Sequence, residues 1–144
     1  MREILFRGKE VRKGKWIEGY YCHYDDIKDS GKDDCDYIVE KHNGEYFPFK
    51  EVITETVGQY TGLTDKNGKK IFEGDILQGT ITSRWNKSLI RCEIVYKGDC
   101  FLAIEKISNT LWEHKVRFSK DIEVIGNIHD NPELLKELQN GNND

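Results

Sequence analysis

The stretch from Val57 to Leu77 constrains the fold of this chain more than any other part of the sequence. Its apolar residues have high β propensity, and the polar run DKNGK separates them into two groups. Asn67 and Gly68 in this run tolerate a positive φ. We therefore expect two strands joined by a hairpin turn over residues 65–69.

A second turn follows at Glu73, Gly74 and Asp75. Glycine frees the backbone there, and the Asp75 carboxylate can accept hydrogen bonds from nearby backbone amides. The two carboxylates also resemble an acid and base pair, but their place at a strand corner favours a structural role. Gly58 and Gly62 indicate close packing of the backbone at a bend. The residues that we assign to this structural motif are Gly58, Tyr60, Gly62, Asp65, Asn67, Gly68, Gly74 and Asp75.

Three segments of the chain carry a resemblance to a known family. The central run GQYTGLTDKNGKKIFEGDI, the closing segment EVIGNIHDNPELL and the opening REILFRG resemble the YopX family of phage and prophage proteins. The closing segment stands in the expected order, and the resemblance covers essentially the whole chain. It implies a β-rich fold of the small SH3-type barrel kind, in an accessory protein of unknown biochemical activity. It implies no set of catalytic residues.

Short β-prone segments alternate with turns through the rest of the chain. This spacing indicates a barrel or sandwich rather than a parallel sheet covered by helices. Hairpin turns are expected near Gly14 and at Asn43 and Gly44, and a polar tip is expected at residues 86–88. Further strands are expected at residues 4–6, 16–21, 37–40, 46–49, 76–85, 89–96, 101–107, 112–118 and 122–125.

One helix is expected, at the C-terminal end. The Asn131 side chain can cap it, Pro132 suits its first position, and Leu134, Leu135 and Leu138 form an apolar stripe before it ends near Asn140. The predicted fold is therefore mainly β: a small SH3-type barrel with an N-terminal β-hairpin extension and a short C-terminal α-helix. The predicted parts of one compact unit are an extension over 1–55, a barrel over 56–130, and a helix with its tail over 131–144.

Composition and charge argue against some classes of protein. The net charge of -4 and the pI near 5.6 argue against a generally basic nucleic-acid binder. No apolar stretch is long enough to span a bilayer, and the N-terminal residues lack the apolar core of a signal peptide. We expect a cytoplasmic protein of a bacterial host cell. Its cysteines are then expected to be reduced thiols: Cys22, Cys35, Cys92 and Cys100.

Metal and catalytic chemistry find little support in the sequence. The acidic residues 25–36 lack the ligand order of an EF-hand loop, so a solvated loop is favoured. Cys22, His23, Cys35 and His42 could ligate zinc, but their spacing is irregular. No nucleophile elbow, zinc-protease helix or phosphate-binding loop is present. We expect no enzyme, no cofactor and no metal site.

Two functions stay open. A self-associating protein-interaction module, with a phage or host protein as partner, is favoured because an all-β chain leaves strand edges that must be covered. The alternative is a small β-barrel that binds nucleic acid by stacking bases on aromatics beside basic residues. The opening segment is also basic, but acids interrupt it. The predicted contact residues for nucleic acid or a partner, around one hairpin tip, are Arg84, Trp85, Lys87 and Arg91.

Overall fold

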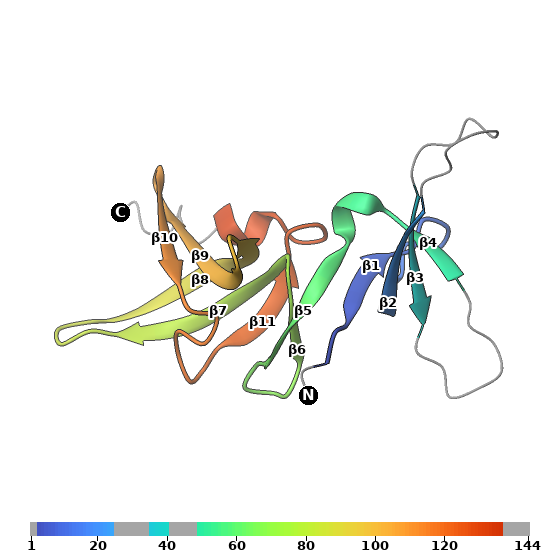
Figure 1. The fold of residues 1–144 in the computed structure, drawn as a ribbon. Coiled ribbons are helices and arrows are strands. Elements are labelled where there is room, and N and C mark those ends of the chain that lie inside the picture. The colour runs from blue at the N-terminus through green and yellow to red at the C-terminus, as the bar shows by residue number, and fades with distance from the viewer. Residues whose placement is uncertain (1–2, 25–34, 41–48, 137–144) are drawn as a thin grey trace. The chain divides into compact units, whose positions relative to one another are not determined.

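The computed structural model describes residues 3–24, 35–40 and 49–136, as eleven strands, one 3-10 turn and the start of a helix (Figure 1). The chain divides into two compact units, residues 1–60 and 61–144, each with its own apolar core. The division falls inside strand β5. The strands are β1 (Phe6–Lys9), β2 (Trp16–Tyr24), β3 (Cys35–Glu40), β4 (Phe49–Val52), β5 (Gly58–Thr64), β6 (Lys70–Phe72), β7 (Asp75–Thr82), β8 (Lys87–Lys97), β9 (Cys100–Ile107), β10 (Thr110–His114) and β11 (Glu123–Asn127).

The first unit is an antiparallel sheet in the order β4, β3, β2, β1, followed by the beginning of β5. Buried residues recur at alternate positions of β2 and β3, so one face of the sheet gathers Ile17, Ile38 and Val52 into a core. An isolated bridge from Glu10 to Val52 joins β4 to the residue that follows β1. The sheet therefore curls strongly.

The hairpin between β1 and β2 turns through residues 10–14, where Gly14 has a φ of 66°. Strands β3 and β4 also pair, with Val39 opposite Phe49. The turn expected at Asn43 and Gly44, the first residues of the strand expected at 46–49, and residues 25–34 of the acidic loop lie outside the described residues.

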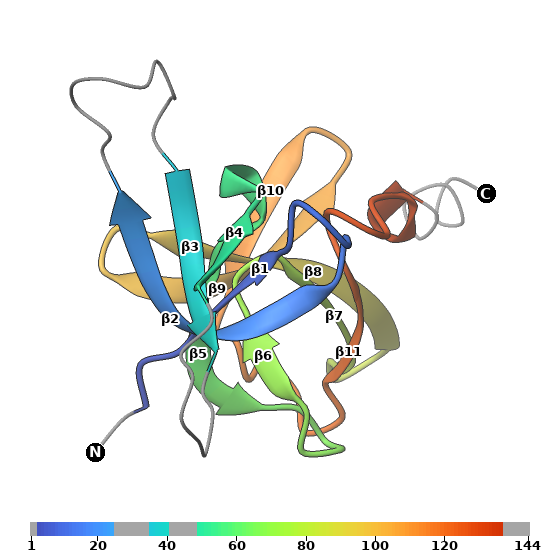
Figure 2. The same ribbon diagram turned by 90° about the vertical axis from the view of Figure 1, so that its right-hand side faces the viewer.

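The second unit contains a five-stranded antiparallel sheet in the order β10, β9, β8, β7, β11. Figure 2 shows these strands in yellow-green to orange, with β11 in orange-red. A bulge between Val124 and Gly126 bends β11 against β7. Fully buried residues at the centre of the core are Ile71, Leu77, Cys92, Ile94 and Ala103.

The mainly β fold is confirmed, but the small SH3-type barrel expected over residues 56–130 is not, because the sheets are open. In the five-stranded sheet, β10 and β11 stand at opposite ends and pair only with β9 and β7. Strand β6 pairs with β5 in the other sheet. Apolar periodicity identifies strands and their buried faces, yet it does not determine which strands become neighbours.

The turn between β7 and β8 differs from the expected one. Strand β7 ends at Thr82, and β8 begins at Lys87, so the tip is residues 83–86 rather than 86–88. The Ser83 amide donates to the Asn86 carbonyl at 2.7 Å, and the Ser83 hydroxyl exchanges hydrogen bonds with the Asn86 backbone. The side chain of Ser83 therefore closes the turn three residues earlier. Strand β10 likewise ends at His114, not at Phe118, whose ring packs on the core.

Helical residues follow β11 at 133–136. Asn131 Oδ1 accepts the backbone amide of Asn127 at 3.3 Å, so this side chain is directed to the preceding turn. The Asn131 backbone carbonyl accepts the amide of Leu134 at 3.1 Å. Leu138 and the expected helix end near Asn140 lie outside the described residues.

Candidate functional site

Asp65 organises the turn between β5 and β6. Its Oδ1 accepts the amides of Asn67 and Lys69, each at 2.9 Å, and its Oδ2 accepts the amide of Val124 at 3.0 Å. Burial alone raises the pKa of Asp65, but these three amides outweigh it and hold the pKa below its usual value. Gly68, with a φ of 80°, completes the turn. The Asp65 carboxylate is therefore fully engaged in structure.

The second turn of the motif uses Gly74 and Asp75 in the same way. Asp75 is 1% exposed, and its Oδ2 accepts the Phe72 amide at 2.7 Å. Gly74 has a φ of 89°, donates its amide to the Ile94 carbonyl and accepts the amide of Ile128. A carboxylate buried this deeply has no access to a substrate, so Asp75 belongs to the framework.

The remaining motif residues lie along β5. Gly58 is buried, and Tyr60 is 8% exposed and donates its amide to the Leu5 carbonyl at 2.7 Å. Gly62 is exposed and has a φ of 86°, a backbone conformation that glycine adopts without strain.

The basic and aromatic residues at the β7–β8 hairpin do not form one cluster. Trp85, at the tip, is 84% exposed, and the Arg84 guanidinium lies 5.6 Å from its ring centroid. Lys87 is exposed at the start of β8. Arg91 is four residues further along β8, about 13 Å away, where it donates to Gln78 Oε1 at 2.8 Å and to the Leu134 carbonyl at 2.7 Å. Arg91 thus ties the C-terminal segment to the sheet.

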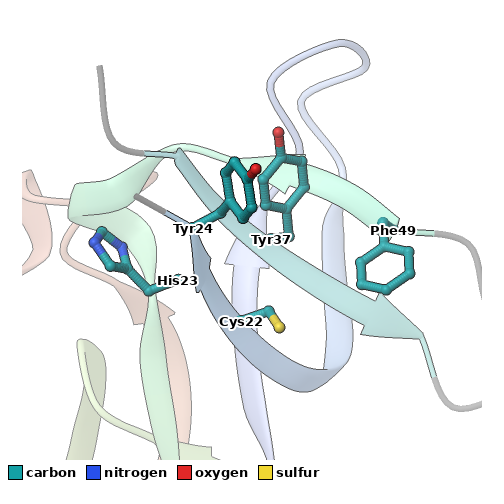
Figure 3. Close-up of a pocket in the computed structure, with 5 residues that line it drawn as sticks. All are labelled: Cys22, His23, Tyr24, Tyr37 and Phe49. Carbon is teal, nitrogen blue, oxygen red and sulfur yellow. The ribbon is translucent and has the colours of Figure 1, made fainter. Parts of the chain in front are cut away.

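The first unit carries an aromatic surface that the sequence analysis did not single out. Cys22, Tyr24, Tyr37 and Phe49 line a hollow of about 300 Å³ on β2, β3 and β4, with His23 at its edge (Figure 3). Tyr24 and Phe49 are 60% and 65% exposed. Because Cys22 is paired with Tyr37, the residues at positions 20, 22, 24 and 37 project from the same, outer face of the sheet. We call Tyr20, Cys22, Tyr24, Tyr37 and Phe49 the aromatic face.

A hydrogen-bonded network lies on the opposite side of the same strands. The Tyr21 hydroxyl donates to Asp36 Oδ1 at 2.6 Å, and His23 Nδ1 lies 2.7 Å from the same oxygen. Partial burial and the Asp36 carboxylate raise the pKa of Tyr21 to about 12. Burial alone raises the pKa of Asp36, but the bonds from Tyr21 and His23 outweigh it and lower the pKa. The network fixes β2 against β3 beneath the aromatic face.

The residues considered for zinc are only partly assembled. Strand pairing places Cys35 opposite Tyr24 and Asp36 opposite His23, while His42 lies outside the described residues. Over residues 3–24, 35–40 and 49–136, no group of three His, Cys, Asp or Glu side chains is arranged to hold a metal ion. In the second unit, burial raises the pKa of Cys92 to about 12, which leaves its thiol unreactive.

The fold and its side chains define a class of protein: two small antiparallel β units, of which the first carries an exposed aromatic face and the second has buried carboxylates that build its turns. No described helix is long and apolar enough to cross a membrane.

The model of the YopX protein family matches residues 5–136, and the chain belongs to the YopX family. Among solved structures it is similar to protein EF1440 from Enterococcus faecalis, with 25% sequence identity and a TM-score of 0.53. The similarity covers 94% of this chain and 99% of EF1440. A search of curated proteins found no similar chain.

Proposed function

We propose that this protein is a non-catalytic protein-interaction module that self-associates, and that it acts as an accessory protein of a phage or prophage in the bacterial cytoplasm. The aromatic face is the observation that supports this proposal. Tyr20, Tyr24 and Phe49 each expose more than half of their surface, on the same face of one sheet. Exposed tyrosine and phenylalanine rings are enriched where proteins bind other proteins.

The architecture beneath this face supports binding rather than catalysis. Ile38 and Val52 pack below it, and the Tyr21 and Asp36 hydrogen bond holds β2 and β3 in register. The aromatic rings therefore stand on a sheet that is already ordered, so a partner would not have to order the sheet on binding. The hollow between the rings suits an apolar side chain of a protein partner.

Affinity capture from prophage-induced cells tests this proposal. We expect the tagged protein to retain a partner protein that is lost when Tyr24→Ser and Phe49→Ser are combined, because both exposed rings are removed. The matched control combines Tyr96→Ser and Trp85→Ser, which removes two exposed rings from the second unit. The control should retain the partner, and nuclease treatment should not release it. Equal capture by both double variants would contradict the proposal.

A second function, nucleic-acid binding, is favoured by one observation, the exposed ring of Trp85 beside the Arg84 guanidinium. Such a pair can stack on a base and contact a phosphate. The engagement of Arg91 by Gln78 and Leu134 weakens this alternative, because it removes one cation from the tip.

Titration with single-stranded and duplex DNA separates the two functions. At physiological salt we expect binding no tighter than the non-specific range of roughly 10 to 100 micromolar, because the net charge of -4 opposes the approach of phosphates. A nanomolar, salt-sensitive complex that Trp85→Ala abolishes would favour the nucleic-acid function instead.

A further inference from the structure

The sheet edges within the described residues differ in how well they are protected. Strand β4 is covered by the chain after β1, since the Ile53 amide donates to the Lys9 carbonyl and the Val11 amide donates to the Glu51 carbonyl. Strand β6 is only three residues long. A β-sheet edge with free backbone groups readily pairs with another chain, and short or covered edges avoid this.

The β11 edge is also occupied. The Val124 amide donates to Asp65, the Asn127 amide donates to Asn131, and the Ile122 carbonyl just before the strand accepts the amide of Lys66. Polar groups of the unit itself therefore satisfy this edge, which leaves no row of backbone groups for a second chain.

Strand β10 lacks these protections. It is the last strand of its sheet, pairs regularly with β9 over five residues, and carries no proline, lysine or bulge. Within the described part of the chain, no backbone group reaches its outer edge. Leu111 and Trp112 are 63% and 54% exposed, and they project from opposite faces of the strand. An edge strand with exposed apolar side chains on both faces is a pairing site.

Hairpin geometry identifies the backbone groups that face outward. A two-residue loop, Ser108 and Asn109, joins β9 to β10, with Ile107 opposite Thr110. Such a loop is closed by a pair that exchanges its backbone hydrogen bonds, and the bonding direction then alternates along the strand. Thr110, Trp112 and His114 therefore face β9, and the backbone groups of Leu111 and Glu113 point away from the sheet.

We propose that β10 pairs antiparallel with β10 of a second copy of this chain, with the twofold axis at Trp112, so that two five-stranded sheets become one. This inference deepens the self-association in the proposed function by naming its surface. With the axis there, Leu111 of one copy lies opposite Glu113 of the other. Their outward backbone groups then form four hydrogen bonds across the interface, two on each side of the axis.

The side chains of β10 fit this register. Trp112 lies opposite Trp112 of the second copy, and directly opposed aromatic residues are favourable cross-strand pairs. The Glu113 carboxylate is already paired with Lys97 of its own chain, so Leu111 of the second copy does not meet an unbalanced charge. An axis at Glu113 would place two carboxylates opposite each other, and an axis at Leu111 would draw loop residues into the pairing.

A charge-swap experiment at Trp112 tests the register, with sedimentation of the full chain as the readout. We expect the wild type to sediment as a dimer at tens of micromolar concentration. Trp112→Lys and Trp112→Glu should each weaken the dimer by about tenfold or more, because like charges meet at the axis. An equimolar mixture of the two variants should restore the dimer, since opposite charges then meet. Trp85→Lys, the same change at an exposed ring outside β10, should leave the dimer intact.

Oxidative crosslinking provides a second measurement if the charged variants fail to fold. In a chain whose exposed Cys22 and Cys100 are replaced by serine, Trp112→Cys should form a covalent dimer under mild oxidation with oxidised glutathione, because paired Cβ atoms at the axis lie about 5 Å apart. Lys106→Cys, on the neighbouring strand β9, should not crosslink.

A wild-type monomer at 100 micromolar, a dimer insensitive to both Trp112 charges, or failure of the mixture to restore it would overturn the β10 proposal. Loss of the dimer with Tyr24→Ser and Phe49→Ser instead would assign self-association to the aromatic face. Partner capture through that face is measured separately, so it can fail while the β10 dimer stands.

Discussion

Replacement of Asp65 with alanine is expected to lower the free energy of unfolding by about 3 kcal/mol or more. The carboxylate is 7% exposed and accepts three backbone amides, from Asn67, Lys69 and Val124. Alanine would leave these amides without their acceptor and would also release β11 from the turn. Urea unfolding of the wild type and the variant at pH 7 measures the difference.

The pH dependence of stability gives an independent check on the same residue. The pKa of Asp65 is lowered in the folded state, so its contribution is complete above the unfolded value of about 3.9 and is lost as the pH falls through the folded value. The stability difference between wild type and Asp65→Ala should therefore be constant from pH 7 to about pH 5 and should shrink below about pH 4.

Two further variants serve as controls for Asp65. Asp65→Asn keeps one oxygen for the turn amides but directs an amide group at Val124, so its loss should fall between those of wild type and alanine. Asp99→Ala, in the exposed turn after β8, should change stability by less than about 0.5 kcal/mol. An Asp65→Ala protein as stable as Asp99→Ala would contradict the role derived from the hydrogen bonds.

Asp65 also marks how far the sequence alone can lead. The run DKNGK predicts the turn, because the partners Asn67 and Lys69 are within four residues. The third partner, Val124, is 59 residues away and is brought near only by the pairing of β11 with β7. Neighbouring residues determine the hydrogen bonds within a turn, so the sequence predicts them. Long-range hydrogen-bond partners depend on the order of the strands, which the apolar periodicity does not determine.

The aromatic face also combines a part that the sequence predicts with a part that depends on strand pairing. Tyr20, Cys22 and Tyr24 recur with the period of two that places them on one face of a strand, a signal present in the sequence. The addition of Tyr37 and Phe49 depends on the register of β2 with β3 and of β3 with β4. That register is fixed by burial of Ile17, Ile38 and Val52 on the opposite face, which involves all three strands together.

The basic set at the β7–β8 hairpin shows the opposite error, in which residues near in sequence are separated in space. Arg84 and Arg91 are seven positions apart, and the predicted tip at 86–88 would have placed both beside it. The turn closed by Ser83 places the tip at residues 83–86, and β8 begins at Lys87. Arg84 therefore lies in the tip, whereas Arg91 lies further along β8. A three-residue shift of a turn is enough to divide a binding site that composition alone suggests.

Replacement of Gly19 with alanine is expected to destabilise the first unit by about 3 kcal/mol or more. Gly19 is the residue of β2 that pairs on both sides, with Phe6 of β1 and with Glu40 of β3. A Cβ atom there would lie 2.0 Å from the Val39 carbonyl oxygen and 2.7 Å from its carbon. Both atoms belong to the backbone, so relief of the clash requires β3 to separate from β2.

Gly68→Ala is the matched comparison for Gly19→Ala, because glycine is favoured at position 68 for its backbone conformation and not for lack of space. A Cβ at Gly68 would meet nothing within 4 Å, and only its φ of 80° opposes the substitution, at a cost of about 1 kcal/mol. Hydrogen exchange of the full chain should show faster exchange in β2 and β3 of Gly19→Ala, with β7 and β8 still protected, because each unit has its own core. If Gly19→Ala melts at the same temperature as Gly68→Ala, then β2 and β3 do not approach as closely as 2.0 Å implies, and the support that they give to the aromatic face is weaker.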